Sequence, residues 1–411
     1  MIESPGSIVV NAREYRLPMQ PTVAITLDGC DPRFLDDAFA RGLTPNLQRM
    51  IARGAYALGR GNMPSFTNVN NMSIVTGGPP SVHGLPGNHY LAPNGEEVQL
   101  SDAKFLRAPG IHAGMQEAGR RVLLVTAKHK LRMMLAHGGV PATSAEKAHE
   151  WPLPQYGIDD VVALVGRSNP GPYEWDMSHY AIEIGIAVSK KVGPLDLMYL
   201  STTDFVQHAE GPGGGMADRF FRRFDELLQE LLDLGYLVGI TADHGMNAKH
   251  DAGGSPRVHY LEDVLQAAGV RDFHVVLPIT DPYVVHHGAL GSFAWVHCPA
   301  EHRMAAYEAL TRLAGVEEVF TREEGAVIYR HPADRIGDFS VASDAGTALG
   351  KSAAKHDLSV LHGPLRSHGG RHEQIVPIIV SQPLTPRYAE TLRHGVQNSD
   401  LHDLLLNGVQ R

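Results

Sequence analysis

The chain is organised around one stretch, Gly239-Ile240-Thr241-Ala242-Asp243-His244-Gly245-Met246. An apolar run over residues 236–241 predicts a buried strand, and the stretch places a carboxylate and an imidazole side by side where that strand ends. Glycine at the next position lets other backbone approach closely. Because carboxylate oxygen and imidazole nitrogen are both common metal ligands, the stretch indicates one side of a metal site. A polar turn is the alternative interpretation, so the ends of the other strands decide between the two.

Other predicted strands end in residues of the same kind. The apolar run over residues 22–27 ends at Asp28, and the run over residues 195–200 leads to Asp204 and His208. Strands that alternate with helices predict an α/β fold, with a mostly parallel central sheet covered by helices on both faces. Ligands bind such sheets at the carboxyl ends of the strands, so we expect these side chains to share one edge with the Asp-His pair.

A candidate nucleophile follows another predicted strand, in Pro64-Ser65-Phe66-Thr67-Asn68. The helix-like run that starts at Thr67 ends at Gly77-Gly78-Pro79-Pro80, a strong stop signal. Thr67 is therefore predicted at a helix N-terminus, where free N–H groups and the helix dipole favour a phosphoryl group or a developing alkoxide. The segment 81–102, which contains Asn88 and is rich in Gly, Pro and His, is interpreted as an active-site loop or hairpin.

The pattern changes in the C-terminal half of the chain. The elements predicted there are a strand over residues 293–297, a helix over residues 300–314 and strands over residues 316–321 and 327–329. Few Asp or Glu residues stand at the ends of these strands, unlike at the ends of the strands described above. We interpret residues 256–352 as an inserted α+β cap domain, and residues 1–255 and 353–411 as the core that carries the metal-binding residues.

The amino-acid composition argues against two classes of binding partner, nucleic acids and membranes. The 411 residues include 36 Lys and Arg against 45 Asp and Glu, a net charge of −9, so no global charge attracts nucleic acid or an anionic membrane. No apolar run reaches the roughly 18 residues of a membrane helix, and the charges in segment 1–20 argue against a signal peptide. Cys30 and Cys298 lie in no ligand-spaced motif, which fits a reducing compartment. We expect a cytoplasmic protein that acts on a small anion, without a nucleic-acid or membrane partner.

The strand ends and loops supply enough ligands for two metal ions. The candidate ligands are Asp28, Thr67, Asp204, His208, Asp243, His244 and His368. Two ions about 4 Å apart would use such a set, whereas one tetrahedral ion would not. Asp204 and His208 are four residues apart, so on a helix they face the same way. A zinc ion lowers the pKa of bound water from about 15.7 to about 7, and the same effect would ionise the hydroxyl of Thr67.

This order of motifs resembles the alkaline phosphatase superfamily, in its nucleotide pyrophosphatase/phosphodiesterase-like branch. The motifs are Asp28-Gly29 after a strand, Pro64-Ser65-Phe66-Thr67-Asn68, Thr203-Asp204-x-x-x-His208, Thr241-Ala242-Asp243-His244-Gly245-Met246 and Ser367-His368-Gly369. The resemblance implies that Asp28, Asp243 and His244 hold one zinc ion, with Thr67 as its nucleophilic ligand. It implies that Asp204, His208 and His368 hold the other zinc ion.

Within that branch the chain resembles hydrolases of phosphonoacetate. The feature is Lys128-x-Lys130 after the strand over residues 121–126, together with Asn88. The two ammonium groups would bind a small carboxylate, and the amide of Asn88 would donate to a phosphonyl oxygen. The implied reaction cleaves the C–P bond to give acetate and phosphate, through a phosphothreonine intermediate on Thr67. A surface Lys-His-Lys turn is the alternative interpretation of the lysines.

Other activities fit the same residues. A phosphodiesterase or phosphomonoesterase would use the same metals and Thr67 to cleave P–O bonds. A phosphate mutase would isomerise its substrate without net phosphate release, and a silent phosphate-binding protein would turn over nothing. The sequence does not fix the metal, because Asp and His also bind Mn²⁺ and Fe²⁺. It also leaves open a homodimer, the movement of the cap and the range of substrates.

The remaining histidines are expected outside the ligand set. Those in glycine-rich or polar segments are predicted to support the ligands or to lie on the surface, namely His83, His89, His250, His259 and His372. In the cap, His286 and His287 are expected to be exposed. Arg366 and Arg371 flank His368 and are expected to be solvated.

Overall fold

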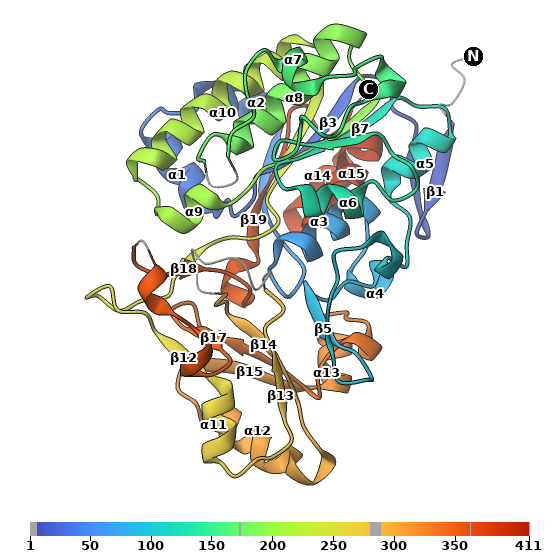
Figure 1. Ribbon diagram of the computed structural model, residues 1–411. Coiled ribbons are helices and arrows are strands. Elements are labelled where there is room, and N and C mark those ends of the chain that lie inside the picture. Colours follow the sequence, from blue (N-terminus) through green and yellow to red (C-terminus); the bar gives the residue numbers. More distant parts are fainter. Residues whose placement is uncertain (1–5, 172–173, 280–288, 362, 411) are drawn as a thin grey trace.

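The computed structural model describes residues 6–171, 174–279, 289–361 and 363–410. Figure 1 shows two bodies, an upper one built on a seven-stranded sheet and a lower one built on a four-stranded sheet. Helices pack on the larger sheet, so the predicted α/β fold is confirmed. No described helix combines the length and the apolar composition that a membrane span requires.

The seven-stranded sheet is mostly parallel. In spatial order its strands are β4 (Ala55–Arg60), β19 (Ile375–Val380), β10 (Leu237–Thr241), β3 (Thr22–Thr26), β9 (Leu197–Ser201), β7 (Val122–Thr126) and β8 (Ala142–Ser144). Strand β19 is antiparallel to both of its neighbours, and the five strands from β10 to β8 are parallel. Thr241 pairs with Thr26, Thr26 with Ser201, and Ser201 with Thr126. Four strands therefore end level with one another, and this register brings the polar residues after them to one edge.

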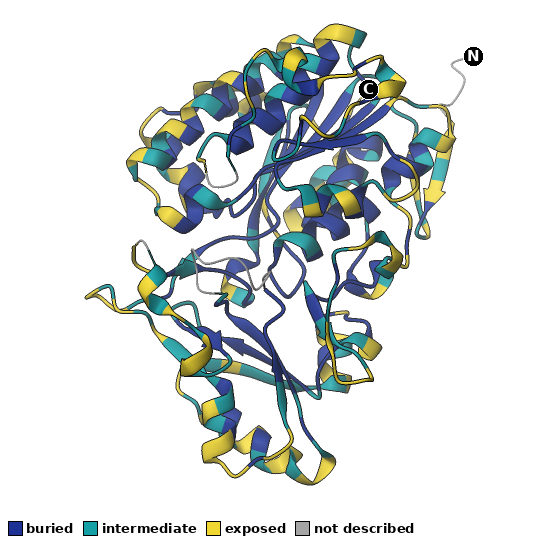
Figure 2. Ribbon diagram, viewed as in Figure 1, coloured by how far each residue is buried: buried dark blue, intermediate teal, exposed yellow. Residues whose placement is uncertain are grey.

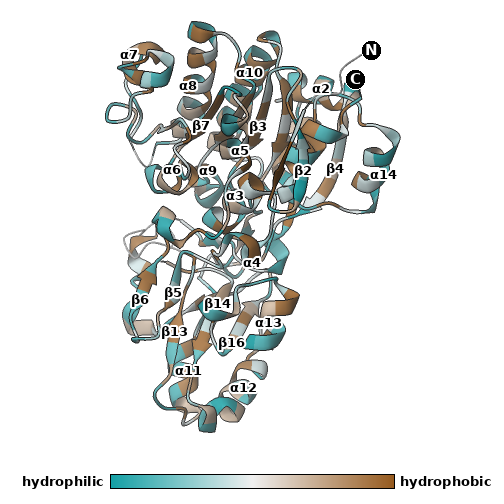
Figure 3. Cartoon of the chain, turned by 90° about the vertical axis from the view of Figure 1, so that its right-hand side faces the viewer, coloured by the Kyte–Doolittle hydropathy of each residue, from teal (hydrophilic) through white to brown (hydrophobic). Residues whose placement is uncertain are grey.

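Helices cover both faces of this sheet (Figure 1). One face carries α1 (Pro32–Ala40), α2 (Pro45–Arg53), α8 (Met177–Val192) and α10 (Gly215–Asp233), and the other carries α3 (Thr67–Thr76), α5 (Ile111–Glu117), α6 (His129–Leu135) and α15 (Leu401–Asp403). Strands β3, β9 and β10 are buried along their whole length, which is why they form continuous apolar runs in the sequence. Figure 3 shows hydrophobic strands of this sheet, β3 and β7 among them, between helices that also carry hydrophilic residues.

Shorter elements complete the upper body. They are the hairpin β1 (Ser7–Val10) and β2 (Arg13–Arg16), and the helices α4 (Pro80–His83), α7 (Val161–Val165), α9 (Phe205–Ala209) and α14 (Pro386–His394). A π-helical turn, Leu404–Gly408, follows α15. Figure 2 shows that burial is concentrated in the large sheet and in the helix faces turned toward it.

The four-stranded sheet of the lower body is antiparallel. In spatial order its strands are β13 (His274–Val276), β14 (Phe293–His297), β16 (Phe339–Ser343) and β15 (Val316–Thr321). One apolar cluster joins this sheet to α11 (Leu261–Ala267) and α12 (Arg303–Thr311). A second cluster joins Phe293 and Trp295 to Phe66, the residue before α3. The lower body therefore packs against the turn that carries Thr67.

Two further strand pairs connect distant parts of the chain with the lower body. The hairpin β5 (His89–Leu91) and β6 (Glu97–Gln99) confirms a hairpin within residues 81–102, whereas the place of this segment in an active site stays a prediction. Glu97 accepts a hydrogen bond from His274 Nε2 at 2.7 Å. Strand β12 (Val258–Tyr260) pairs in parallel with β17 (Ala348–Gly350). The domain limits at residues 256 and 352 stay a prediction.

One element of the lower body was predicted wrongly. The strand expected over residues 327–329 is instead the end of helix α13 (Arg322–Ile328). Thr321 and Glu324 form a capping box that starts this helix, and Val327 and Ile328 face solvent. The local capping signal therefore prevails over the β propensity of a short apolar run.

Candidate active site

Polar side chains that follow three parallel strands meet at the edge of the large sheet. Asp28 follows β3, Asp243 follows β10, and Asp204 follows β9 at the start of α9. The N–H of Asp28 donates to Thr202 Oγ1 at 2.8 Å, and the N–H of Gly29 donates to Asp243 Oδ1 at 3.1 Å. Gly29 has a φ of 67°, and a Cβ there would lie 2.8 Å from Asp204 Cβ. Glycine is therefore required where these strand ends approach each other.

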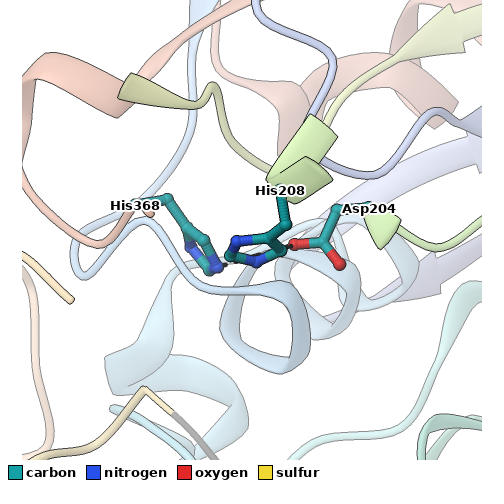
Figure 4. A group of neighbouring side chains, drawn as sticks. All are labelled: Asp204, His208 and His368. Carbon is teal, nitrogen blue, oxygen red and sulfur yellow. Dashed lines mark ion pairs between the residues drawn. The ribbon is translucent and has the colours of Figure 1, made fainter. Parts of the chain in front are cut away.

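Asp204, His208 and His368 form one group of candidate ligands (Figure 4). Nε2 of His208 lies 3.0 Å from Asp204 Oδ2, and Nε2 of His368 lies 3.6 Å from the same oxygen. His208 lies one helical turn after Asp204, as their spacing predicts, whereas His368 comes from the C-terminal part of the chain. The two histidines are buried and Asp204 is half-buried.

The second group contains Asp28, Asp204 and His244, so Asp204 is common to both groups. Nε2 of His244 lies 3.3 Å from Asp28 Oδ1 and 3.9 Å from Asp243 Oδ2. The hydroxyl of Thr67, the first residue of α3, lies 3.4 Å from Asp28 Oδ1 and 3.3 Å from His244 Nε2. The structure thus brings all seven candidate ligands into one cluster.

Each of the three histidines is oriented by a backbone carbonyl. Nδ1 of His244 lies 2.9 Å from the carbonyl oxygen of Gly245, Nδ1 of His208 lies 2.8 Å from that of Arg366, and Nδ1 of His368 lies 2.7 Å from that of Ser65. A carbonyl oxygen can only accept, so Nδ1 carries the proton and a neutral ring presents Nε2 as a lone pair. Metal-binding histidines are oriented in this way.

The charge balance of the cluster also fits divalent cations. Within the described residues, Asp28, Asp204 and Asp243 form ion pairs only with histidines. Burial, with the charges of Asp204 and Asp243, raises the pKa of Asp28 well above its usual range. Burial lowers the pKa of His244, but the carboxylates outweigh it and raise that pKa to about 10. Buried carboxylates without a cation are costly, and a divalent ion would supply the missing positive charge.

Asn71 is a functional residue that the sequence analysis missed. Its Nδ2 donates to Asp243 Oδ2 at 3.1 Å and to the carbonyl oxygen of Thr67 at 2.8 Å. Its Oδ1 accepts from the hydroxyls of Tyr199 at 2.7 Å and Ser201 at 2.8 Å. Asn71 follows Thr67 by one helical turn in a helix whose later residues are all buried. A fully buried amide in such a helix was the available signal, because it needs partners.

Lys128, Lys130 and Asn88 lie on two other segments. Lys128 is the N-cap of α6, and Glu146 Oε2 fixes this turn by accepting from the N–H of His129 at 2.7 Å. Burial lowers the pKa of Lys130, although the charge of Glu146 opposes the shift. Asn88 precedes β5, and its Nδ2 donates to the carbonyl oxygen of Ile279 at 2.6 Å.

An electrostatic interaction connects these two segments. Burial lowers the pKa of His89, and the charge of Lys130 contributes to that shift. The start of α6 and the start of the β5–β6 hairpin are therefore close enough for their charges to interact.

The other histidines have partners away from the ligand groups. His83 is buried against Ser73, with Nε2 3.0 Å from the Ser73 hydroxyl, and burial lowers its pKa to about 3. The ring nitrogens of three others contact the carbonyl oxygens of Asp251 (from His250) and Ala314 (from His259) and the carboxylate of Glu317 (from His372). His286 and His287 lie outside the described residues.

The arginines beside His368 are not simply solvated. Arg366 Nε donates to the carbonyl oxygen of Gln207 at 2.8 Å, and burial lowers the pKa of Arg366 to about 10. Arg371 Nε donates to Glu318 at 2.6 Å. The expectation of a solvated loop arginine is wrong for Arg366, because the strand Arg366–Ser367 is packed against α9. Arg371 stays partly exposed but is paired with Glu318.

Comparisons with known proteins show what the whole chain is similar to. The family model of type I phosphodiesterase / nucleotide pyrophosphatase matches residues 22–371. Solved structures of phosphonoacetate hydrolase from Sinorhizobium meliloti 1021, in complex with phosphonoacetate and with phosphonoformate, are 44% identical to this chain, with a TM-score of 0.91. In both cases the match covers 98% of this chain and 99% of that chain.

More distant structures share the fold alone. Murine ectonucleotide pyrophosphatase / phosphodiesterase 5 is 16% identical, with a TM-score of 0.64, and the match covers 95% of this chain and 96% of that chain. Its human counterpart is 17% identical over the same shares, with a TM-score of 0.63.

Proposed function

Because the chain belongs to the type I phosphodiesterase / nucleotide pyrophosphatase family of the alkaline phosphatase superfamily, we propose that it hydrolyses phosphonoacetate to acetate and phosphate. The observation that carries the proposal is the position of Thr67, whose hydroxyl contacts Asp28 and His244 inside a buried cluster of candidate metal ligands. Likeness to a phosphonoacetate hydrolase over nearly the whole of both chains supports this substrate.

The ligand groups would hold two divalent ions, which we propose to be zinc, with Mn²⁺ or Fe²⁺ as alternatives. Asp28, Asp243, His244 and Thr67 would hold one ion, and Asp204, His208 and His368 the other. Bound there, such ions would lower the pKa of a hydroxyl group and offset the charge of phosphoryl oxygens.

Thr67 is the nucleophile of the proposed reaction. Its hydroxyl gives up its proton to solvent, and the oxygen forms a bond to phosphorus while the C–P bond breaks; the electron pair of that bond goes to the carbon of the departing acetate, as an enolate. A proton from solvent completes acetate. Water then attacks phosphorus of the phosphothreonine, which releases phosphate and restores the Thr67 hydroxyl. The first N–H groups of α3 are unsatisfied within the helix, so they favour negative charge on the transferred group.

Lys128 and Lys130 distinguish this substrate from a phosphate ester. We assign their ammonium groups to the carboxylate of phosphonoacetate and to the charge of the departing enolate. Asn88 would donate to a phosphonyl oxygen. A chain with a net charge of −9 needs such local cations to hold a small, multiply charged anion.

Phosphate release from the metal-loaded protein tests the assignment. Phosphonoacetate should be hydrolysed faster than p-nitrophenyl phosphate and its esters. Lys128→Ala/Lys130→Ala should lose activity on phosphonoacetate and keep its metal content. Full activity of that variant on phosphonoacetate would show that the substrate is wrong even if the metal site is right.

A phosphodiesterase or phosphomonoesterase is the second candidate, because the family model that matches describes phosphodiesterases. It would show the opposite preference, with fast release of p-nitrophenol and slow release of phosphate from phosphonoacetate.

We also propose a cytoplasmic location and a small anionic substrate, with no nucleic-acid or membrane partner; a homodimer stays open. Cys30 and Cys298 are free, buried thiols, which a reducing compartment preserves.

A further inference from the structure

A buried ion pair lies behind the ligand cluster, and the proposed chemistry does not use it. Nζ of Lys249 lies 2.9 Å from Glu373 Oε1, and neither side chain exposes any surface to solvent. Burying a lysine and a glutamate is costly unless both are fully hydrogen-bonded. The second oxygen of Glu373 accepts from the N–H of Gly370 at 2.9 Å, and Lys249 Nζ also donates to the carbonyl oxygen of Ala345 at 2.9 Å. The pair therefore joins several segments.

The first segment carries His244. Asn247 Nδ2 donates to Glu373 Oε1 at 2.6 Å, and the N–H of Gly245 donates to the carbonyl oxygen of Glu373 at 2.7 Å. Strand β11 (Asn247–Ala248) pairs antiparallel with β18 (Arg366–Ser367), which directly precedes His368. The loop that follows His244 and the loop that contains His368 are thus fastened to each other by backbone and side-chain hydrogen bonds.

The second segment leads to Thr67. Gly370, held by Glu373, accepts through its carbonyl oxygen from the hydroxyl of Ser65 at 2.8 Å. Ser65 in turn gives its own carbonyl oxygen to Nδ1 of His368 at 2.7 Å. One carboxylate therefore restrains the turn before the nucleophile together with the two histidine loops.

These restraints matter because His244 and His368 belong to different metal sites. Their rings stack with centroids 3.6 Å apart and planes within 5° of parallel. A shift of either loop would change the separation of the two Nε2 atoms, and with it the spacing of the two ions. Lys249 also contacts Ala345, just after β16, so the same pair connects this spacing to the lower body.

We propose that Lys249 and Glu373 are positioning residues that set the distance between the His244 and His368 loops and thereby the affinity of the two-metal site. This inference rests on the metal site proposed above and is independent of the substrate. Residues that support ligands from behind typically change metal affinity by about 10- to 100-fold when they are mutated.

The test compares stability with metal binding in the full-length protein. The variants are Glu373→Gln, Lys249→Met and the double variant Lys249→Met/Glu373→Gln, which removes both charges at nearly constant volume. Thermal unfolding is measured in EDTA, and Co²⁺ binding is followed by its visible absorption, which reports the ligand geometry. Each single variant leaves one buried charge unpaired and should unfold at a lower temperature. The double variant should recover most of the lost stability but bind Co²⁺ about 10- to 100-fold more weakly, with an altered spectrum.

Asp225→Asn is the matched control. Asp225 is also buried, and its carboxylate accepts from the N–H groups of Asn46 at 3.0 Å and Leu47 at 2.8 Å, at the contact of α10 with α2. This variant should lose stability and keep the Co²⁺ affinity and spectrum of the wild type. If Asp225→Asn weakened Co²⁺ binding as much as the double variant does, the weaker binding would follow from lost stability alone. That result would overturn the inference.

Two further results separate failure of the positioning role from failure of the metal site itself. Unchanged Co²⁺ binding by the double variant would overturn the positioning role alone. Absence of Co²⁺ binding by the wild type would overturn the proposed metal site and this inference with it, whatever the substrate.

Discussion

The reactivity that we propose for Thr67 depends on its neighbours. A threonine hydroxyl is scarcely ionised at neutral pH, and here it lies within 3.4 Å of a carboxylate and 3.3 Å of an imidazole nitrogen. It also begins helix α3, so its position is fixed by the packing of Phe66 into the lower body. A side chain held in this way needs little reorganisation to attack.

Replacing the nucleophile tests this residue. Thr67→Ala should lower kcat for phosphonoacetate by about 10³-fold or more, because no covalent intermediate can form. Thr67→Ser should keep measurable activity. Acid-quenched wild type should show phosphate on the peptide that contains Thr67, by mass spectrometry. A Thr67→Ala protein with the wild-type rate would disprove the nucleophile.

The pKa of His244 gives a pH prediction for the metal-free protein. Burial lowers this pKa, but the carboxylates raise it to about 10, above the value of about 6.5 in the unfolded chain. The stability contributed by protonated His244 is therefore complete below pH about 6.5 and is lost as the pH rises through about 10. In EDTA, the melting temperature of the wild type should fall between pH 7 and 10 more steeply than that of His244→Gln. If the melting temperatures of the two proteins fell in parallel between pH 7 and 10, the raised pKa of His244 would be contradicted.

At the scale of elements, helix α3 joins Thr67, the proposed nucleophile, to the sheet. Asn71, one turn after Thr67, is hydrogen-bonded to Asp243 and to residues of β9. The helix is therefore oriented by a polar contact as well as by apolar packing.

Removing that contact should be costly. Asn71→Ala should lower the free energy of unfolding by about 2–4 kcal/mol, because it leaves a small cavity and unpaired buried groups around Tyr199 and Asp243. Asn68→Ala, at a half-buried position of the same helix, should cost much less. Urea denaturation of the two metal-free variants makes the comparison, and equal losses would show that the Asn71 contacts add nothing.

The helices and strands also show which parts of the structure can be predicted from the sequence and which cannot. Strands β3, β9 and β10 could be predicted because burial on both faces makes most of their residues apolar, and the candidate ligands after them could be found because parallel strands end together. Strand β8 has three residues and no such run. The sequence signal that starts helix α13 is one capping box, and the apolar run at its end predicts a strand instead. Asn71 belongs to no motif, and Lys249 and Glu373 are 124 residues apart, so only the folded chain shows that they pair.

At the scale of the whole molecule, the site lies where the two bodies meet. Ser292, just before β14, donates its N–H to the carbonyl oxygen of His368 at 2.9 Å, and Phe66 packs on Phe293 of the lower body. Bound metals would therefore stabilise the junction as well as the chemistry.

Metal removal should destabilise the protein as a whole. A ligand at 100 times its dissociation constant stabilises by about 2.7 kcal/mol, so EDTA should lower the melting temperature of the metal-loaded wild type by several degrees. Asp204→Asn removes the carboxylate common to both ligand groups, and its melting temperature should respond much less to EDTA. If EDTA lowered the melting temperatures of both proteins equally, the stabilising ions would bind at another site.

The most direct measurement is anomalous X-ray scattering at the zinc edge from crystals grown with zinc. The account predicts two peaks about 4 Å apart, one within coordination distance of Asp28, His244 and Thr67 and the other within coordination distance of Asp204, His208 and His368. Peaks elsewhere in the molecule, or none at this cluster, would contradict it.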